Sequence, residues 1–242
     1  MTDAAATFSA LLLAHGLADF VLQTDAMVAG KGRLRVAALH AASVAALTFL
    51  VVAAPNLAAL GTALAVTAVH IAIDRIKQAV GDTLGPFLAD QAAHLATLGA
   101  AALVVPTLWA DGVWAALLPE GTAPALAYLA FGLIAVRAGR FAVGKTLATI
   151  GTDAEIEGIA EGSLKDAGAR IGELERLLTY ALVVTGNTTG VAFLVAAKSI
   201  LRFDATRDDR ASAEYIIVGT LASIAWALGA AFLAILLIGD TP

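Results

Sequence analysis

The chain has 242 residues, of which 60% are hydrophobic and only 14% are charged. Soluble domains contain about 45–50% apolar and about 25% charged residues, and the mean hydropathy of +0.84 departs from them in the same direction. This composition excludes an ordinary soluble protein and indicates helices that face lipid. The lack of cysteine excludes disulfides, iron–sulfur clusters and cysteine nucleophiles. A net charge of −5 without a basic stripe argues against nucleic-acid binding.

Eight apolar segments follow one another along the chain. A spanning helix needs about 20 mostly apolar residues. Breaks at Pro55, Gly81 and Pro106 separate the early segments, because glycine and proline interrupt helices. The expected fold class is therefore all-α, a polytopic transmembrane helical bundle. Its expected segments are 6–27, 34–54, 57–79, 86–105, 124–145, 173–186, 188–203 and 214–238.

The sixth and seventh segments are shorter than the others and meet at residues 186–190. They could form two thin spans or one re-entrant hairpin over residues 173–203. A hairpin of half-helices is tolerated where protein or a cavity covers its backbone. Both alternatives remain open.

The basic residues indicate an orientation with the N-terminus outside. In that orientation the inside loops are 28–34, 78–86, 145–173 and 203–214, and all 15 Lys and Arg lie in these loops or within a few turns of them. The outside segments carry none, in agreement with the positive-inside rule. The acidic stretch 146–172 is expected to be a cytoplasmic loop, either a solvated linker or a docking element.

All four histidines lie within the first four expected segments, and three of them have an aspartate four residues away. Residues four apart share one face of a helix. The third and fourth segments run antiparallel through the turn near residue 82, so His70 is expected beside His94. The pattern predicts a His/Asp cluster in the cytoplasmic half of the membrane. Its members are His15, Asp19, His40, His70, Asp74, Asp90 and His94.

These residue types favour a divalent metal centre. A carboxylate inside a span costs about 2.5–3.5 kcal/mol and persists when it is paired, hydrated or metal-bound. Imidazole and carboxylate ligands without cysteine suit Zn, Mn or Fe. Seven candidates exceed one site, so they predict two metals or one metal with outer partners. Asp19, Asp74 and Asp90 are the candidate catalytic carboxylates. A proton or cation pathway and a structural hydrogen-bond network are the alternatives.

Other polar residues are candidates for contacts with a substrate. Gln23 and Gln91 adjoin the cluster and are expected to be hydrogen-bond partners or interfacial polar residues. Lys198, Arg202 and Glu214 lie at the expected inner interface of the C-terminal half. They could hold an anionic head group, or they could be snorkelling cations with an ion-paired carboxylate. The expected domains are a four-helix unit over residues 1–110 that carries the cluster and a C-terminal unit over 111–242.

The run LLLAHGLADFVLQTD, the histidine of the next helix, and the runs HIAIDRIK and LADQAAHL resemble a bacterial membrane family, domain of unknown function family 3307. This resemblance covers about residues 8–105. The runs IGELERLL, AAKSILRF and AEYIIVGTLAS are similar to the C-terminal half of its longer members. The resemblance implies a multi-pass protein of the bacterial cytoplasmic (inner) membrane and implies no chemistry. The cluster is also similar in style to those of membrane-bound metal-dependent hydrolases, whose exact motifs are absent here.

The sequence thus predicts a metal-dependent, hydrolase-like membrane enzyme that acts on a lipid or another amphipathic small molecule. Lys198 and Arg202 would hold the anionic group of that substrate. An ion- or proton-coupled transporter is one alternative, although no internal repeat typical of transporters is evident. A structural or regulatory membrane subunit, docking through the acidic loop, is the other.

Overall fold

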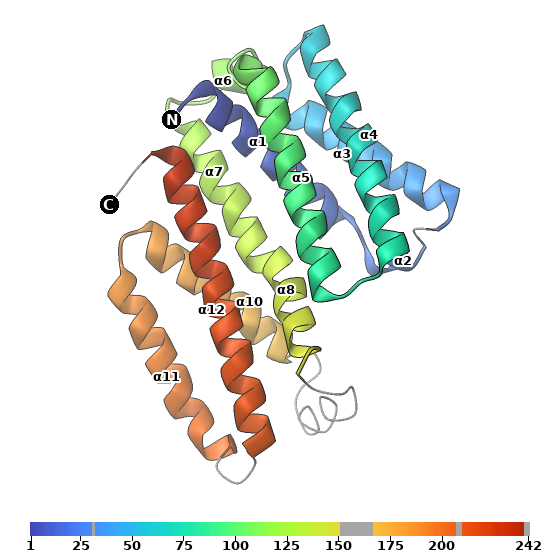
Figure 1. The fold of residues 1–242 in the computed structure, drawn as a ribbon. Coiled ribbons are helices and arrows are strands. Elements are labelled where there is room, and N and C mark those ends of the chain that lie inside the picture. The colour runs from blue at the N-terminus through green and yellow to red at the C-terminus, as the bar shows by residue number, and fades with distance from the viewer. Residues whose placement is uncertain (31, 151–166, 207–209, 240–242) are drawn as a thin grey trace. The chain divides into compact units, whose positions relative to one another are not determined.

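The fold is known from a computed structural model, which describes residues 1–30, 32–150, 167–206 and 210–239 (Figure 1). These residues form helices, short helical turns and loops, with no β-strand among them. The expected all-α fold class is therefore confirmed. The described residues divide into two compact units, one of residues 1–133 together with 236–239, and one within residues 134–235. The expected domains over 1–110 and 111–242 stay a prediction.

Unit 1 holds the elements that arise from the first four expected segments and the start of the fifth. Two short turns accompany its α-helices, the π-helical η1 (Ala18–Leu22) after α1 and the 3-10 turn η2 (Pro106–Leu108) after α5. Its α-helices are α1 (Asp3–Leu17), α2 (Asp25–Ala29), α3 (Leu34–Val52), α4 (Leu57–Val80), α5 (Leu84–Val104), α6 (Val113–Leu117) and α7 (Thr122–Leu133).

Helix α1 is the centre of unit 1 and packs against α3, α5 and α7 (Figure 1). Its middle turns are rich in alanine and leucine, and Ala10, Leu11 and Leu12 are fully buried. Small alanine side chains let neighbouring helices approach closely. Thr7 ties this helix to the loop after α5, because its Oγ1 donates to the carbonyl of Pro106 and accepts from the backbone N–H of Trp109. The polar residues of the next turns of α1 are thereby placed among three helices.

Local signals set the ends of the helices. The side chains of Thr2 and Asn56 accept hydrogen bonds from the backbone at the starts of α1 and α4, as N-caps do. Gly81, with φ of 109°, ends α4 and turns the chain into α5. Pro106 ends α5, because proline disfavours a helical conformation at the preceding residue.

The first expected span is shorter than the sequence indicates. It was expected to run through residue 27, but helical structure ends at Leu22 and Gln23 is extended. A separate short helix, α2, then begins after Thr24, whose side chain accepts a hydrogen bond from Met27 N–H. The cause is local: the π-turn loosens the helix, and the cap at Thr24 offers a competing start.

Unit 2 holds the rest of the fifth expected segment and the last three. The π-helical turn η3 (Ile134–Ala138) leads into α8 (Gly139–Leu147). Three longer helices follow, α10 (Ala167–Val184), α11 (Thr188–Thr206) and α12 (Arg210–Ile238), of which α12 ends in unit 1. Helix α10 packs against α8, α11 and η3 (Figure 1).

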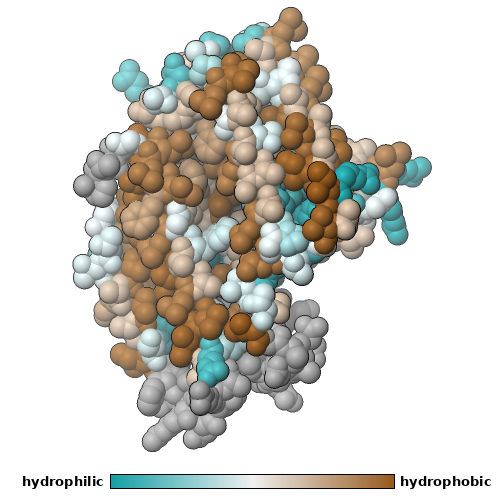
Figure 2. Space-filling model, viewed as in Figure 1, coloured by the Kyte–Doolittle hydropathy of each residue, from teal (hydrophilic) through white to brown (hydrophobic). Residues whose placement is uncertain are grey.

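Six helical stretches are long and apolar enough to cross a membrane. Large apolar side chains point outward from several of them, and Leu57 and Leu103 are 86% and 76% exposed. Figure 2 shows hydrophobic side chains over much of the visible face. All eight expected segments form helices, but α10 and α11 fall outside this group of six, and the orientation stays a prediction. The six stretches are Asp3–Leu22, Leu34–Val52, Leu57–Val80, Leu84–Val104, Thr122–Leu147 and Ser212–Ile238.

Candidate metal centre

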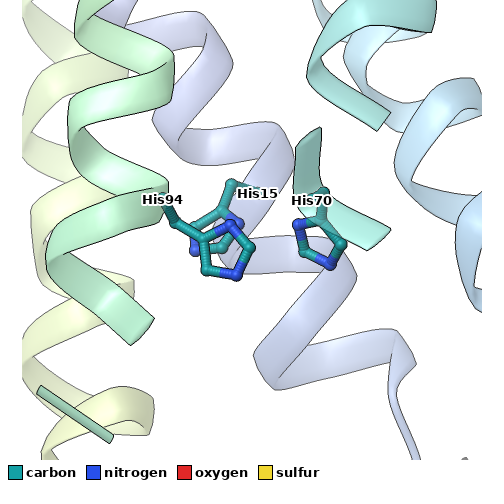
Figure 3. Close-up of side chains that lie close together, drawn as sticks. All are labelled: His15, His70 and His94. Carbon is teal, nitrogen blue, oxygen red and sulfur yellow. The ribbon is translucent and has the colours of Figure 1, made fainter. Parts of the chain in front are cut away.

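The seven His and Asp residues expected to cluster meet inside unit 1. Helix α1 and its π-turn supply two of them, α3 supplies one, and α4 and α5 supply two each. In Figure 3, His15, His70 and His94 come from three different helices and point into one space. The ring centres of His70 and His94 are 4.3 Å apart, and those of His15 and His94 are 4.7 Å apart. All four histidines are buried, with at most 5% of their surface exposed.

The tightest group joins Asp19, His40, His70 and Asp74. Nε2 of His40 lies 3.0 Å from Nε2 of His70, and Oδ1 of Asp19 lies 3.5 and 3.4 Å from these two nitrogens. Oδ2 of Asp74 lies 3.6 Å from the His40 nitrogen and 3.9 Å from the His70 nitrogen. Ligands at about 2.0–2.1 Å from a tetrahedral Zn²⁺ are about 3.4 Å from one another. Asp19, His40 and His70 therefore present three ligand atoms at nearly the spacing of a tetrahedral site, and Asp74 adjoins the two histidines.

A second set of ligand atoms adjoins the first. Oδ1 of Asp90 lies 3.6 Å from Nε2 of His94. Asp74, Asp90 and His94 offer ligand atoms within 4.8 Å of one another, and His15, His70 and His94 do the same. Because Asp74 and His70 belong to both sets, the two sets are continuous. The cluster is large enough for one metal with outer partners or for two metals.

Several ligand atoms at the centre of the cluster accept or donate no hydrogen bond. They are buried, and most buried polar atoms of side chains have a partner. Asp19 Oδ1 faces His70 Nε2 at 3.4 Å and Asp90 Oδ1 faces His94 Nε2 at 3.6 Å without forming hydrogen bonds, and a metal ion between such atoms would engage their lone pairs directly. The atoms in question are His15 Nε2, Asp19 Oδ1, Asp90 Oδ1 and His94 Nε2.

Outer partners hold two members of the cluster. The amide nitrogen of Gln23 lies 3.3 Å from Nδ1 and 3.1 Å from Nε2 of His40. Oδ2 of Asp90 accepts hydrogen bonds of 3.0 Å from both Lys77 Nζ and Gln91 Nε2. Side chains that hydrogen-bond metal ligands orient them. Gln23 makes this contact from an extended position, because helical structure ends at Leu22.

Lys77 is the residue of this site that the sequence interpretation missed. Its ammonium pairs with Asp90 at 3.0 Å and lies 5.2 Å from the ring centre of Phe87. It was grouped with the loop cations because it lies near the end of its segment. The spacing in the sequence could have identified Lys77, because His70, Asp74 and Lys77 follow an i, i+4, i+7 pattern on one face of α4.

The charges of the cluster favour a divalent cation. The carboxylates of Asp19, Asp74 and Asp90 outnumber the one ammonium of Lys77, so these acidic and basic side chains leave two negative charges in a buried setting. Uncompensated charge is costly away from water. One divalent ion would balance this charge.

The remaining candidate residues lie in unit 2. Lys198 Nζ pairs with Oε2 of Glu175 at 2.7 Å, a partner that the sequence interpretation did not include. Glu214 is exposed near the start of α12. Arg202 belongs to α11, but its side chain lies outside the described residues, as does most of the acidic loop, residues 151–166. Lys198, Arg202 and Glu214 are therefore far from the members of the His/Asp cluster in the sequence.

The fold and the buried cluster define an all-helical protein with several apolar helices that could span a membrane and with His/Asp groups that could hold a metal ion. Comparison with protein families gives a match over residues 7–115 to the family described as protein of unknown function, DUF3307. This match covers less than half of the chain, confirms the expected resemblance over that part, and includes every member of the His/Asp cluster. No curated protein and no solved structure matches the chain.

Proposed function

We propose that this chain is a multi-pass bacterial inner-membrane enzyme with an intramembrane divalent metal centre, which hydrolyses a lipid or another amphipathic substrate. One observation carries the metal part of this proposal. Asp19 Oδ1, His40 Nε2 and His70 Nε2 lie 3.0–3.5 Å from one another, and Asp74 Oδ2 lies 3.6 and 3.9 Å from the two histidine nitrogens. Four candidate ligands from two helices, α3 and α4, and the π-turn η1 are hard to account for as packing alone.

A divalent metal bound by these four residues would supply Lewis-acid chemistry by polarising a carbonyl or phosphoryl oxygen. Asp90 and His94 are placed to handle protons beside it. Lys77 and Gln91 occupy Oδ2 of Asp90, so Oδ1 is the oxygen directed toward His94 Nε2 at 3.6 Å. A carboxylate that orients an imidazole makes a competent general acid or base. Hydrolysis adds the elements of water across the cleaved bond and needs no oxidant or reductant.

The first test is a metal titration of the full chain. The protein would be purified in detergent with an affinity tag that contains no histidine, stripped with a chelator, and titrated with Zn²⁺, Mn²⁺ and Fe²⁺. We expect one or two ions per chain by mass spectrometry. Asp19→Asn and His40→Gln should each lower the affinity by at least tenfold, because each removes or weakens one of four ligands.

Asp111→Asn is the matched control, since Asp111 is exposed and contacts Thr107 rather than the cluster. It should bind metal as the unmodified chain does. A folded protein that binds none of the three metals would overturn the metal centre. The catalytic part has its own readout, the release of inorganic phosphate from micelles that contain phosphatidate, with and without metal. Metal binding without release of phosphate would exclude phosphatidate as the substrate and leave the metal centre intact.

A further inference from the structure

Unit 2 contains a half-open cavity of about 380 Å³ that the proposed chemistry does not use. It is bounded by α8, α10, α11 and α12, all within residues 134–235. Its charged lining residues are three bases, Arg140, Arg176 and Lys198, and one carboxylate, Glu175. Glu175 is already engaged by Lys198 at 2.7 Å. The lining therefore carries an excess of positive charge.

Arg176 is the most unusual of these residues, because its side chain is buried and its partners are uncharged. It is 2% exposed. Nε and Nη2 donate to the carbonyl of Val136 at 3.3 and 3.1 Å, and Nη1 donates to Ser223 Oγ at 3.3 Å. A guanidinium has five N–H donors, so two remain for another partner. No carboxylate forms a salt bridge with it among the described residues.

The local fold is arranged around this arginine. Val136 belongs to the π-turn η3, where the altered helical pattern leaves a carbonyl available to an outside donor. Gly139 makes room for the arginine stem, since a Cβ there would lie 2.7 Å from Arg176 Cδ. A Cβ at Gly172 would lie 3.1 Å from Nη1, so glycine leaves that side of the guanidinium uncovered. The guanidinium is thus held in position at the cavity wall.

Glu173, three residues before Arg176 on α10, is already shared among other bases. Oε1 of Glu173 lies 3.3 Å from Arg137 and 3.6 Å from Arg140, and Oε2 lies 3.2 Å from Arg170. One carboxylate thus faces three guanidinium groups and cannot neutralise Arg176 as well. Glu173 and Glu175 each offset part of the buried charge of Arg176, but both also pair with other bases, so positive charge is in excess. Unbalanced buried charge is unfavourable, which points to an anion in this cavity.

Apart from the hydroxyl groups of Tyr215, Thr220 and Ser223, the rest of the lining consists of apolar residues and glycines, which indicates the kind of anion. Val143, Leu147, Ile171 and Ile216 contribute walls beside the basic groups. Ile171 is 41% exposed, so this apolar wall continues to the outer surface of the helix. An inorganic anion would gain nothing from such walls, whereas an amphiphile would place its head group at the bases and its chains along the apolar residues.

We infer that this cavity binds the anionic head group of a membrane phospholipid, with Arg176 and Arg140 as the residues that contact the phosphate. Arginine suits this role because its planar donors match phosphate oxygens. The inference stands on unit 2 alone and does not require the metal centre. Its failure would leave the proposed hydrolase untouched.

The test compares lipid retention by the purified full chain. The protein in detergent would be incubated with mixed micelles of phosphatidylglycerol and phosphatidylcholine, and bound lipid would be measured by native mass spectrometry. We expect about one phosphatidylglycerol per chain and at least tenfold less phosphatidylcholine. Arg140→Gln should weaken phosphatidylglycerol binding about five- to tenfold.

Arg137→Gln is the matched control. Arg137 contacts the same oxygen of Glu173 as Arg140 does, but it does not line the cavity. It should bind lipid as the unmodified chain does. Arg176→Gln could disturb folding, so Arg176→Lys is tested beside it. Lysine keeps the positive charge but lacks the planar donors of arginine, so Arg176→Lys should bind phosphatidylglycerol with intermediate affinity.

Three outcomes would overturn the inference. The first is equal retention of the two lipids. The second is equal effects of Arg140→Gln and Arg137→Gln. The third is displacement of phosphatidylglycerol by inorganic phosphate at the same concentration, because the apolar walls would then contribute nothing and the ligand would be free phosphate.

Discussion

At the scale of single residues, the environment of Asp90 shows how a charge is held inside the helical unit. Its side chain is almost fully buried, and one oxygen accepts from Lys77 and Gln91 while the other faces His94. The paired oxygen stabilises the ionised form through charge-assisted hydrogen bonds. The second oxygen has no hydrogen-bond partner. Asp90 is therefore both fixed in position and available to a ligand.

Replacing Lys77 should reveal the charge balance of the cluster. Lys77→Met removes the ammonium 3.0 Å from Asp90 and leaves a buried carboxylate with fewer partners. In the metal-free protein we expect a loss of about 1–3 kcal/mol in the free energy of unfolding. A bound divalent ion would replace the missing positive charge. The increase in melting temperature on adding metal should therefore be larger in Lys77→Met than in the unmodified chain.

Arg75→Met serves for comparison, because Arg75 is an exposed base two residues earlier on α4. It should change neither the stability nor the response to metal. If metal stabilises Lys77→Met no more than it stabilises the unmodified chain, the Lys77 ammonium and the metal do not interact with the same carboxylates. The stability and its increase on adding metal are both measured by thermal unfolding in detergent, with and without a chelator.

At the scale of elements, two π-turns supply the backbone irregularities that the candidate sites use. In unit 1, η1 carries Asp19 and ends the first span before Gln23. In unit 2, η3 carries Val136, whose carbonyl anchors Arg176. Single π-turns inside α-helices are frequent at functional sites. Neither is evident from apolar periodicity, because a π-turn shifts the pattern by only one residue.

Gly112 provides a test of how the loop after α5 fits against α3. A Cβ at this position would collide with the backbone carbonyl of Val52 and lie 3.0 Å from that of Trp109. The next residue, Val113, donates its N–H to Ala53. Gly112→Ala should therefore destabilise the protein by about 1–3 kcal/mol, as overpacking does, with a lower melting temperature in detergent.

Gly99→Ala is the control for that change. Gly99 lies in α5, and a Cβ there would meet nothing within 4 Å. Alanine favours a helix by up to about 1 kcal/mol over glycine, so this variant should be neutral or slightly stabilised. Equal melting temperatures for the two variants would show that the loop does not pack against the end of α3 as described.

At the scale of the whole molecule, the distribution of basic residues predicts an orientation that can be measured directly. The chain lacks cysteine, so single cysteines can be introduced without altering others. Two single-cysteine variants, Asp82→Cys and Glu120→Cys, serve this purpose. Asp82 lies in the turn between α4 and α5, and Glu120 lies just before α7. Both positions are exposed.

An impermeant thiol reagent should label Glu120→Cys in intact cells and Asp82→Cys only after permeabilisation. The reason is the positive-inside rule, which places the Lys- and Arg-bearing loops on the cytoplasmic side. The reverse pattern would invert the orientation, and labelling of both in intact cells would contradict a span over Leu84–Val104. Thr189→Cys, beside the turn between α10 and α11, would distinguish two thin spans from a re-entrant hairpin in the same assay.

The sequence by itself determined the helical class, the places of the apolar helices and the membership of the His/Asp cluster. It could do so because composition, breaks and i, i+4 spacing are local properties of the chain. Tertiary structure alone decided that Asp19, His40, His70 and Asp74 form the tightest group, that Lys77 pairs with Asp90, and that Lys198 pairs with Glu175. These contacts join residues from different helices, and the distances between such residues depend on packing that no local pattern encodes.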